Sequence, residues 1–313
     1  MRPCNSRFAL LLFSLLNVIA AQAQEPQPQA ATPALSPATA VSSDLVFLPV
    51  SVTGPDARPI ISLGKQNFTL LEDNRPQTIL SFSAEDAPAS IGILLDLSGS
   101  MQLKLPAARA AILEFGRNSN PHDEFFIVGF SRRPALLADF TSSADDLKAR
   151  LANVETGHST ALYDALCFAF EKMNASRYHR RALLIVSDGA DNASIHTEHD
   201  ADTAARKAQL PIYSIIVTHP DAATIEERNG PIFLNGLSNS TGGQSFQDGD
   251  PSQMQAAAAT VSIALRAQYV LGYKTDNVRM DGRWRKVKVK LSPPPGLPQL
   301  TVHARAGYYA PLQ

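Results

Sequence analysis

Residues 91–101 read IGILLDLSGSM, an unbroken apolar run that ends in the pattern Asp-x-Ser-x-Ser. An apolar run without alternation is typical of a strand that is buried on both faces of a parallel sheet. Further apolar runs of this kind occupy residues 125–128, 182–186 and 212–217. Segments of helical period occupy residues 105–117, 160–175, 200–209 and 252–267. This alternation predicts an α/β fold with a doubly wound, mostly parallel sheet.

Two carboxylates follow strands of the predicted sheet at the point where each strand ends. Asp96 directly follows the first run, and Asp188 follows residues 182–186 with one serine between. Ligands of open α/β sheets bind beyond the carboxyl ends of the strands. Ser98 and Ser100 add hydroxyls to the loop of Asp96, and Thr160 adds a third hydroxyl at the expected start of a helix. These five side chains form a candidate site.

The donor set of this site contains oxygen only, with no Cys or His. It suits a hard cation such as Mg²⁺, or Mn²⁺ or Ca²⁺, and not Zn²⁺. The two carboxylates only balance the charge of a divalent ion, and the hydroxyls are weak ligands. Because Mg²⁺ needs six coordination positions, at least one position is left for water or an incoming oxygen anion. The pattern therefore predicts a metal-dependent binding site. The alternative is that these Asp, Ser and Thr side chains only cap helices.

Three segments together resemble the metal-ion-dependent adhesion site of von Willebrand factor type A domains. They are residues 93–101 (ILLDLSGSM), 159–165 (STALYDA) and 185–191 (IVSDGAD). The resemblance covers about residues 89–265. It implies that the metal is held by the hydroxyls of Ser98, Ser100 and Thr160, and directly or through water by Asp96 and Asp188.

Short strand-like runs flank this region on both sides, and turn residues separate them. Three of the flanking segments, residues 67–77 (NFTLLEDNRPQ), 269–273 (YVLGY) and 305–309 (RAGYY), are similar to exported bacterial VWFA-related proteins. Neither flank holds enough strands for a core of its own, so we expect residues 43–88 and 266–313 to form one small antiparallel β-sandwich-like module. The domain of residues 89–265 is then an insertion in this module, by analogy with integrin β subunits.

The first 42 residues read as export and linker sequence. Arg2 and Arg7 precede an apolar run, and Ala21 and Ala23 supply the small pair of a cleavage site, so residues 1–23 are predicted to be a signal peptide. Residues 24–42 are rich in Pro and Ala and are expected to be a disordered linker. The mature chain is then exported, to the periplasm or out of the cell, with no membrane span.

The remaining features of the sequence have structural interpretations. From residue 266 onward the chain has nine basic and two acidic residues. However, Arg283, Arg285, Lys286, Lys288 and Lys290 alternate with Trp284, Val287, Val289 and Leu291, which is typical of a strand with one solvated face. We therefore expect no nucleic-acid partner. Residues 196–202 (HTEHDAD) could be a second metal site, but Asp200 to Asp202 are typical of a helix start. Cys167 is expected to be a small buried side chain rather than a reactive thiol.

These observations favour an exported, non-enzymatic binding protein that captures a protein partner through a divalent metal completed by an acidic side chain of the partner. One alternative is a structural component of an envelope assembly whose metal site is idle. The other is a metal-dependent hydrolase, in which a divalent ion activates water or a phosphate. Against the hydrolase, Ser98 stands where an aspartyl-phosphate hydrolase has a second carboxylate, and no Gly-x-Ser-x-Gly elbow occurs.

Overall fold

A six-stranded sheet forms the centre of the protein in the computed structural model, which describes residues 45–217, 224–248, 250 and 252–312. The strand order is β10-β9-β8-β5-β6-β7, and every neighbouring pair is parallel except β6 with β7. The strands are β5 (Ser90–Asp96), β6 (Glu124–Phe130), β7 (Pro134–Thr141), β8 (Arg181–Ser187), β9 (Ile212–Val217) and β10 (Ser245–Asp248). The predicted mostly parallel sheet is confirmed.

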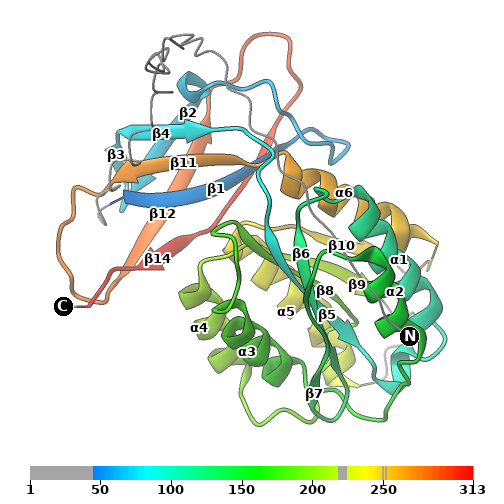
Figure 1. Cartoon of the computed structure of the whole chain (residues 1–313). Helices are drawn as coiled ribbons and strands as arrows, with labels where there is room; N and C mark the ends of the chain where they lie inside the picture. Colours follow the sequence, from blue (N-terminus) through cyan, green and yellow to red (C-terminus); the bar gives the residue numbers. More distant parts are fainter. Residues whose placement is uncertain (1–44, 218–223, 249, 251, 313) are drawn as a thin grey trace, which may run out of the picture. The chain divides into compact units, whose positions relative to one another are not determined.

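Helices cover both faces of this sheet (Figure 1) because its central strands are apolar on both sides. All seven residues of β5 are buried. Ile91, Ile93 and Leu95 pack into one core, and Leu94 packs into the other. The first core takes side chains from α1 (Leu105–Asn118), α2 (Ala144–Ala152) and α6 (Gln253–Arg266), and the second from α3 (Leu162–Met173), α4 (Glu198–Ala208) and α5 (Ile225–Thr241).

Four elements of the central domain were not expected from the sequence, namely β7, β10, α2 and α5. The helix α5 contains Pro231 in its interior together with Gly230 and Gly236, which are residues that weaken helices. It forms because Thr224 and Glu227 make a reciprocal capping box at its start, and because Leu234 and Leu237 are buried against the sheet.

The remaining strands form two antiparallel four-stranded sheets that share one core. In the first, of order β13-β1-β11-β4, β1 pairs with both β11 and β13. In the second, of order β14-β12-β2-β3, β2 pairs with β12. The strands are β1 (Leu45–Thr53), β2 (Phe68–Glu72), β3 (Arg75–Gln77), β4 (Ile79–Ser83), β11 (Tyr269–Lys274), β12 (Trp284–Leu291), β13 (Thr301–Ala304) and β14 (Gly307–Tyr309). Strands from before and after the α/β domain therefore build one sandwich.

A buried carboxylate on β2 forms hydrogen bonds that connect the two sheets of this sandwich. Glu72 ends β2 and is 2% exposed. Its Oε2 accepts hydrogen bonds from the hydroxyls of Tyr273 on β11 and Tyr308 on β14, each at 2.8 Å, and its Oε1 accepts one from Thr275. Burial and the nearby Glu72 carboxylate raise the pKa of Tyr308 to about 12, so this hydroxyl stays a donor.

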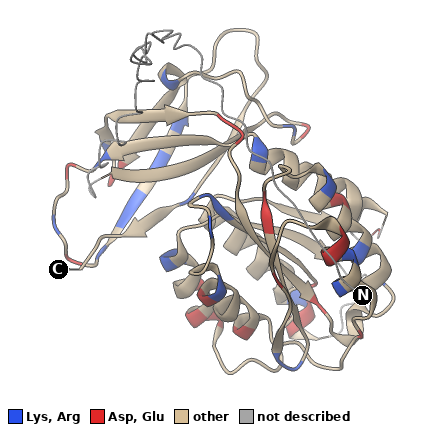
Figure 2. Ribbon diagram, viewed as in Figure 1, with Lys and Arg blue, Asp and Glu red and all other residues tan. Residues whose placement is uncertain are grey.

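The basic strand of the sandwich has one solvated face, but Arg285, which was expected on it, is buried and donates a hydrogen bond to Asp281. On β12, Lys286, Lys288 and Lys290 are exposed while Val287 is buried. Figure 2 shows blue segments, the colour of Lys and Arg, along the ribbon of the sandwich. Cys167 on α3 is half-buried, and burial raises the pKa of its thiol. The helices in the described part of the chain include none that is long and apolar enough to cross a membrane. The predicted signal peptide and linker lie outside the described residues.

We expect Glu72→Ala to destabilise the sandwich, because two buried tyrosine hydroxyls and the partly buried hydroxyl of Thr275 lose their acceptor. The free energy of unfolding should fall by on the order of 2–4 kcal/mol. The fluorescence of Trp284, the one Trp of the chain, reports unfolding of β12 directly in a urea titration. The exposed Glu85→Ala is the matched control and should stay within about 0.5 kcal/mol of wild type. Equal midpoints for the two variants would contradict the role of Glu72.

Candidate metal centre

The two carboxylates of the candidate site lie on neighbouring strands. Asp96 is the last residue of β5, and Asp188 directly follows β8. These strands are parallel and paired through Leu95 and Val186, so their carboxyl ends meet at one edge of the sheet. Both carboxylates are buried, Asp96 completely. The structure thus brings together two like charges that are 92 positions apart in the chain.

The Asp96 carboxylate is fixed by hydrogen bonds from the loop that follows it and from the end of β8. Its Oδ1 accepts the backbone N–H of Ser98 at 2.8 Å, and its Oδ2 accepts the hydroxyl of Ser187 at 2.6 Å. The Ser187 hydroxyl in turn accepts the backbone N–H of Gly189 at 2.9 Å. Ser187 was not predicted as a site residue, and here it positions Asp96.

A second chain of hydrogen bonds joins the predicted hydroxyl donors to Asp188. The hydroxyls of Ser98 and Ser100 lie 2.9 Å apart, and the Ser100 hydroxyl donates to Oδ2 of Asp188 at 2.6 Å. The other oxygen of Asp188 accepts the backbone N–H of Ala190 at 3.1 Å. Four of the five predicted donors are therefore linked by hydrogen bonds across the edge of the sheet.

Thr160 joins this group through its backbone. It lies two residues before α3 begins and so does not itself open the helix, which differs from the sequence-based expectation. Its N–H donates to Oδ1 of Asn192 and its carbonyl accepts the N–H of Asn192, each at 2.9 Å. The N–H of Gly157, in the same loop, donates to the carbonyl of Leu97 at 2.6 Å. The buried Thr160 thus lies in a loop fastened to both carboxylate-bearing loops.

The electrostatics of the site fit a cation. Burial and the charge of Asp188 raise the pKa of Asp96 to about 7, although hydrogen bonds from Ser187 and Ser98 oppose this shift. Two buried carboxylates that repel each other are stabilised by a positive ion between them. The described residues hold no cluster of three or more His, Cys, Asp or Glu that could bind a metal, so an ion at this edge would need the hydroxyls as ligands. The donors present, all oxygen, fit Mg²⁺, Mn²⁺ or Ca²⁺.

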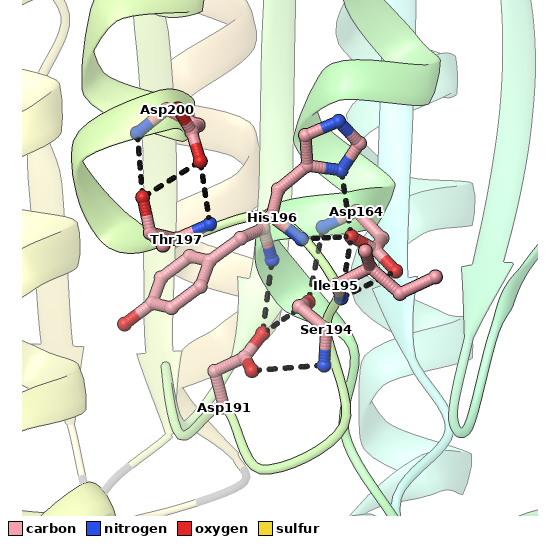
Figure 3. Close-up of polar contacts among 8 residues, drawn as sticks. Asp164, Asp191, Ser194, Ile195, His196, Thr197 and Asp200 are labelled. Atoms are coloured by element: carbon pink, nitrogen blue, oxygen red, sulfur yellow. Dashed lines mark hydrogen bonds and ion pairs between the residues drawn. The ribbon is translucent and has the colours of Figure 1, made fainter.

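The loop after Asp188 is held by two further carboxylates, Asp191 and Asp164 (Figure 3). Oδ2 of Asp191 accepts the hydroxyl of Ser194 at 2.6 Å, and Oδ1 of Asp164 accepts the backbone N–H of His196 at 2.9 Å. Burial opposes ionisation of Asp164, but hydrogen bonds from His196 and Ile195 bring its pKa below the usual value. The Asp164 anchor was not predicted, because it joins residues that are 32 positions apart in the chain.

The same contacts explain the His-rich segment of residues 196–202. Nδ1 of His196 lies 2.7 Å from Asp164, and Thr197 and Asp200 form a capping box at the start of α4. The residues therefore shape the helix start, as the structural interpretation held, with Thr197 rather than Asp200 as the N-cap.

A close approach between two glycines fixes the Asp188 loop against α5. Gly189 has φ of +80°, which favours glycine. A Cβ on Gly230 would lie 2.4 Å from the carbonyl carbon of Gly189 and 2.6 Å from the carbonyl oxygen of Asp188. At the far end of α5, the carbonyl of Ser240 accepts the N–H of Ala306, in the connection between β13 and β14.

Comparison with known proteins shows which domain family this region resembles. The sequence profile of the von Willebrand factor type A domain matches residues 91–190. A von Willebrand factor type A structure from Catenulispora acidiphila is similar in fold, with a TM-score of 0.51 and 11% identity over 84% of this chain and 73% of that chain. No curated protein matches the chain.

Two further solved structures are similar to a smaller part of the chain. BatB from Bacteroides thetaiotaomicron has a TM-score of 0.46 and 18% identity over 56% of this chain and 98% of that chain. The vWF domain of the type V pili tip protein Mfa5 from Porphyromonas gingivalis has a TM-score of 0.47 and 14% identity over 56% of this chain and 94% of that chain.

The raised pKa of Asp96 predicts how the metal-free protein responds to pH. The folded state keeps the Asp96 proton up to about pH 7, because the pKa of Asp96 is raised to about 7, whereas the unfolded chain loses this proton near the ordinary aspartate pKa of 3.8. The folded state therefore binds more protons between these values, and its stability falls as pH rises from about 4 to 7, by on the order of 2–4 kcal/mol. Asp96→Asn should lack this decline, and thermal melts at several pH values compare the two proteins.

Added Mg²⁺ should counter this loss of stability, because it compensates the negative charge that Asp96 acquires above about pH 7. The melting temperature of the wild-type protein should therefore rise more at pH 8 than at pH 5, and that of Asp96→Asn should respond at neither pH. An equal response of the wild-type protein at both pH values would contradict the assignment.

The glycine contact predicts a selective effect of one methyl group. Gly230→Ala places a Cβ against the backbone of the Asp188 loop, so we expect a loss of roughly 1–3 kcal/mol in stability and weaker Mg²⁺ binding, measured by calorimetry. Gly236→Ala, in the same helix, meets no atom within 4 Å and should leave Mg²⁺ binding unchanged. Identical Mg²⁺ affinities of the two variants would show that this contact does not position the loop.

Proposed function

The central part of this chain is a von Willebrand factor type A domain, and from this premise we propose that the protein is an exported, non-enzymatic binding protein. It captures a protein partner through a divalent ion, Mg²⁺ or alternatively Mn²⁺ or Ca²⁺, whose coordination an acidic side chain of the partner completes. Asp96, Ser98, Ser100, Thr160 and Asp188 are the residues that would hold the ion.

The observation that carries this proposal is the hydrogen-bonded network around two buried carboxylates. Ser98, Ser100 and Asp188 are already in contact, with 2.9 Å and 2.6 Å between successive oxygens. Asp96 is held in one orientation by the N–H of Ser98 and the hydroxyl of Ser187. A donor set held in this way loses little conformational entropy when it takes up an ion.

The balance of charge supports capture of an anion. A bound divalent ion would supply a Lewis-acidic position for an oxygen anion. Asp96 and Asp188 neutralise its charge without exceeding it, so a further carboxylate is not repelled. At pH values below about 7 the ion must also displace the proton of Asp96, so binding should strengthen as pH rises.

The non-enzymatic part of the proposal rests on the chemistry of the same residues. Ser98 and Ser100 donate or accept hydrogen bonds within the site, and Ser100 bonds to a carboxylate rather than to an imidazole. A nucleophilic serine needs an adjacent general base, and Asp188 is placed to hold the hydroxyl rather than to form a serine, histidine and aspartate relay. The export part rests on the signal-like sequence of residues 1–23.

Affinity capture of envelope proteins tests the proposal. Wild-type protein, Asp188→Ala and the exposed control Asp145→Ala are immobilised, each with Mg²⁺ and with chelator. We expect a partner that Mg²⁺ retains on wild type and Asp145→Ala, and that chelator or Asp188→Ala reduces at least about 10-fold. Capture of the same partner in every condition would instead support a scaffold with an idle metal site, and Mg²⁺-dependent turnover of a phosphoester panel would support a hydrolase.

A further inference from the structure

The two loops that carry the carboxylates also expose two bulky apolar side chains. Among the residues that the structure describes, Leu103 at 92% and Ile195 at 91% are the most exposed large apolar side chains. Scattered apolar residues are ordinary on protein surfaces. These two are almost fully in water, one in each loop that carries a carboxylate, so a partner that covered this edge would remove apolar surface from water at both.

The backbone around both residues is fixed, so these side chains are held outward. Leu103 follows the 3-10 helix η2 (Gly99–Met101), and the N–H of Lys104 donates to the carbonyl of Met101 at 2.9 Å. The N–H of Ile195 donates to the Asp164 carboxylate at 3.0 Å (Figure 3). These bonds fix the backbone from which each side chain projects.

The two side chains lie on opposite sides of the site. Leu103 leads into α1, which packs into the core on one face of the central sheet, and Ile195 leads into α4, which packs into the core on the other face. Asp96 and Asp188 lie at the edge of the sheet between these faces. Leu103 and Ile195, which we call the apolar pair, therefore flank the carboxylates.

Basic residues lie at the same edge. Arg132 and Arg133 are exposed in the turn between β6 and β7, and the carbonyl of Ser131 accepts the N–H of Ala161, next to Thr160, at 2.7 Å. Lys104 adjoins Leu103 and is close enough to Asp188 for that charge to oppose the lowering of its pKa by burial. Cations around the site favour the approach of an acidic segment.

We propose that this edge is a docking face for a protein segment in which one Asp or Glu is flanked by bulky apolar residues. The proposal rests on the proposed function and specifies the partner of the same site. The carboxylate meets the metal position, and the apolar neighbours cover Leu103 and Ile195. Their contact excludes water from the charged centre, which strengthens the interaction of the partner carboxylate there.

A displayed library of random 12-residue peptides tests the proposal. Peptides are selected on the wild-type protein with Mg²⁺ and released with chelator. We expect the released peptides to share an acidic residue next to Leu, Ile, Phe or Val. They should bind Leu103→Ser and Ile195→Ser roughly 10-fold more weakly, and bind the control Val278→Ser, which changes a 76% exposed side chain in the sandwich, like wild type.

Titration of Mn²⁺ separates the two proposals. The apolar-pair variants should bind Mn²⁺ as wild type does, because neither side chain is a ligand. Released peptides that lack apolar neighbours, or that bind both variants like wild type, would overturn the docking face and leave the proposed function standing. The absence of any chelator-released peptide would overturn the proposed function, and with it the docking face. Metal-independent binding of phosphatidylglycerol vesicles through Leu103 and Ile195 would also overturn the protein partner.

Discussion

Repulsion between two buried carboxylates is the constraint that organises the central domain. Parallel pairing of β5 and β8 brings Asp96 and Asp188 to one edge of the sheet, and burial makes their charges costly. The hydrogen bonds of Ser98, Ser187 and Ser100 offset part of this cost. They do not remove it, since the pKa of Asp96 still rises to about 7. A sheet optimised only for stability would gain from a neutral residue here, which is the reason for proposing that the two carboxylates hold a cation.

The loops around the carboxylates are held from outside the site. Asp164 and Asp191 anchor the loop that leads to α4, and Gly230 lets α5 approach the backbone of Gly189. The opposite end of α5 contacts the β-sandwich through Ser240 and Ala306. One helix thus contacts both the Asp188 loop and the module formed by the two ends of the described chain. Within the sandwich, hydrogen bonds to the buried Glu72 carboxylate join β2 to β11 and β14.

The sequence was sufficient to predict the elements that have a strong period, and it proposed five oxygen donors, four of which the structure links by hydrogen bonds. The apolar run of residues 91–95 marked β5, and the five oxygen donors could be identified because each lies in a short motif. What it could not show are contacts that depend on lateral packing. Ser187 bonds to Asp96 only because β5 and β8 are neighbours. The helix α5 was missed because Gly230 and Pro231 weaken helices locally, and here packing outweighs propensity.

A metal centre at Asp96 and Asp188 can be tested without a partner by titrating Mn²⁺ and following the electron paramagnetic resonance signal of the free ion. We expect wild-type protein to suppress the free signal of the first equivalent of Mn²⁺. Asp188→Ala should leave that signal unsuppressed while remaining folded, since Asp188 lies beyond the end of β8. An undiminished signal with wild-type protein, or equal suppression by Asp188→Ala, would contradict a metal centre at this edge of the sheet.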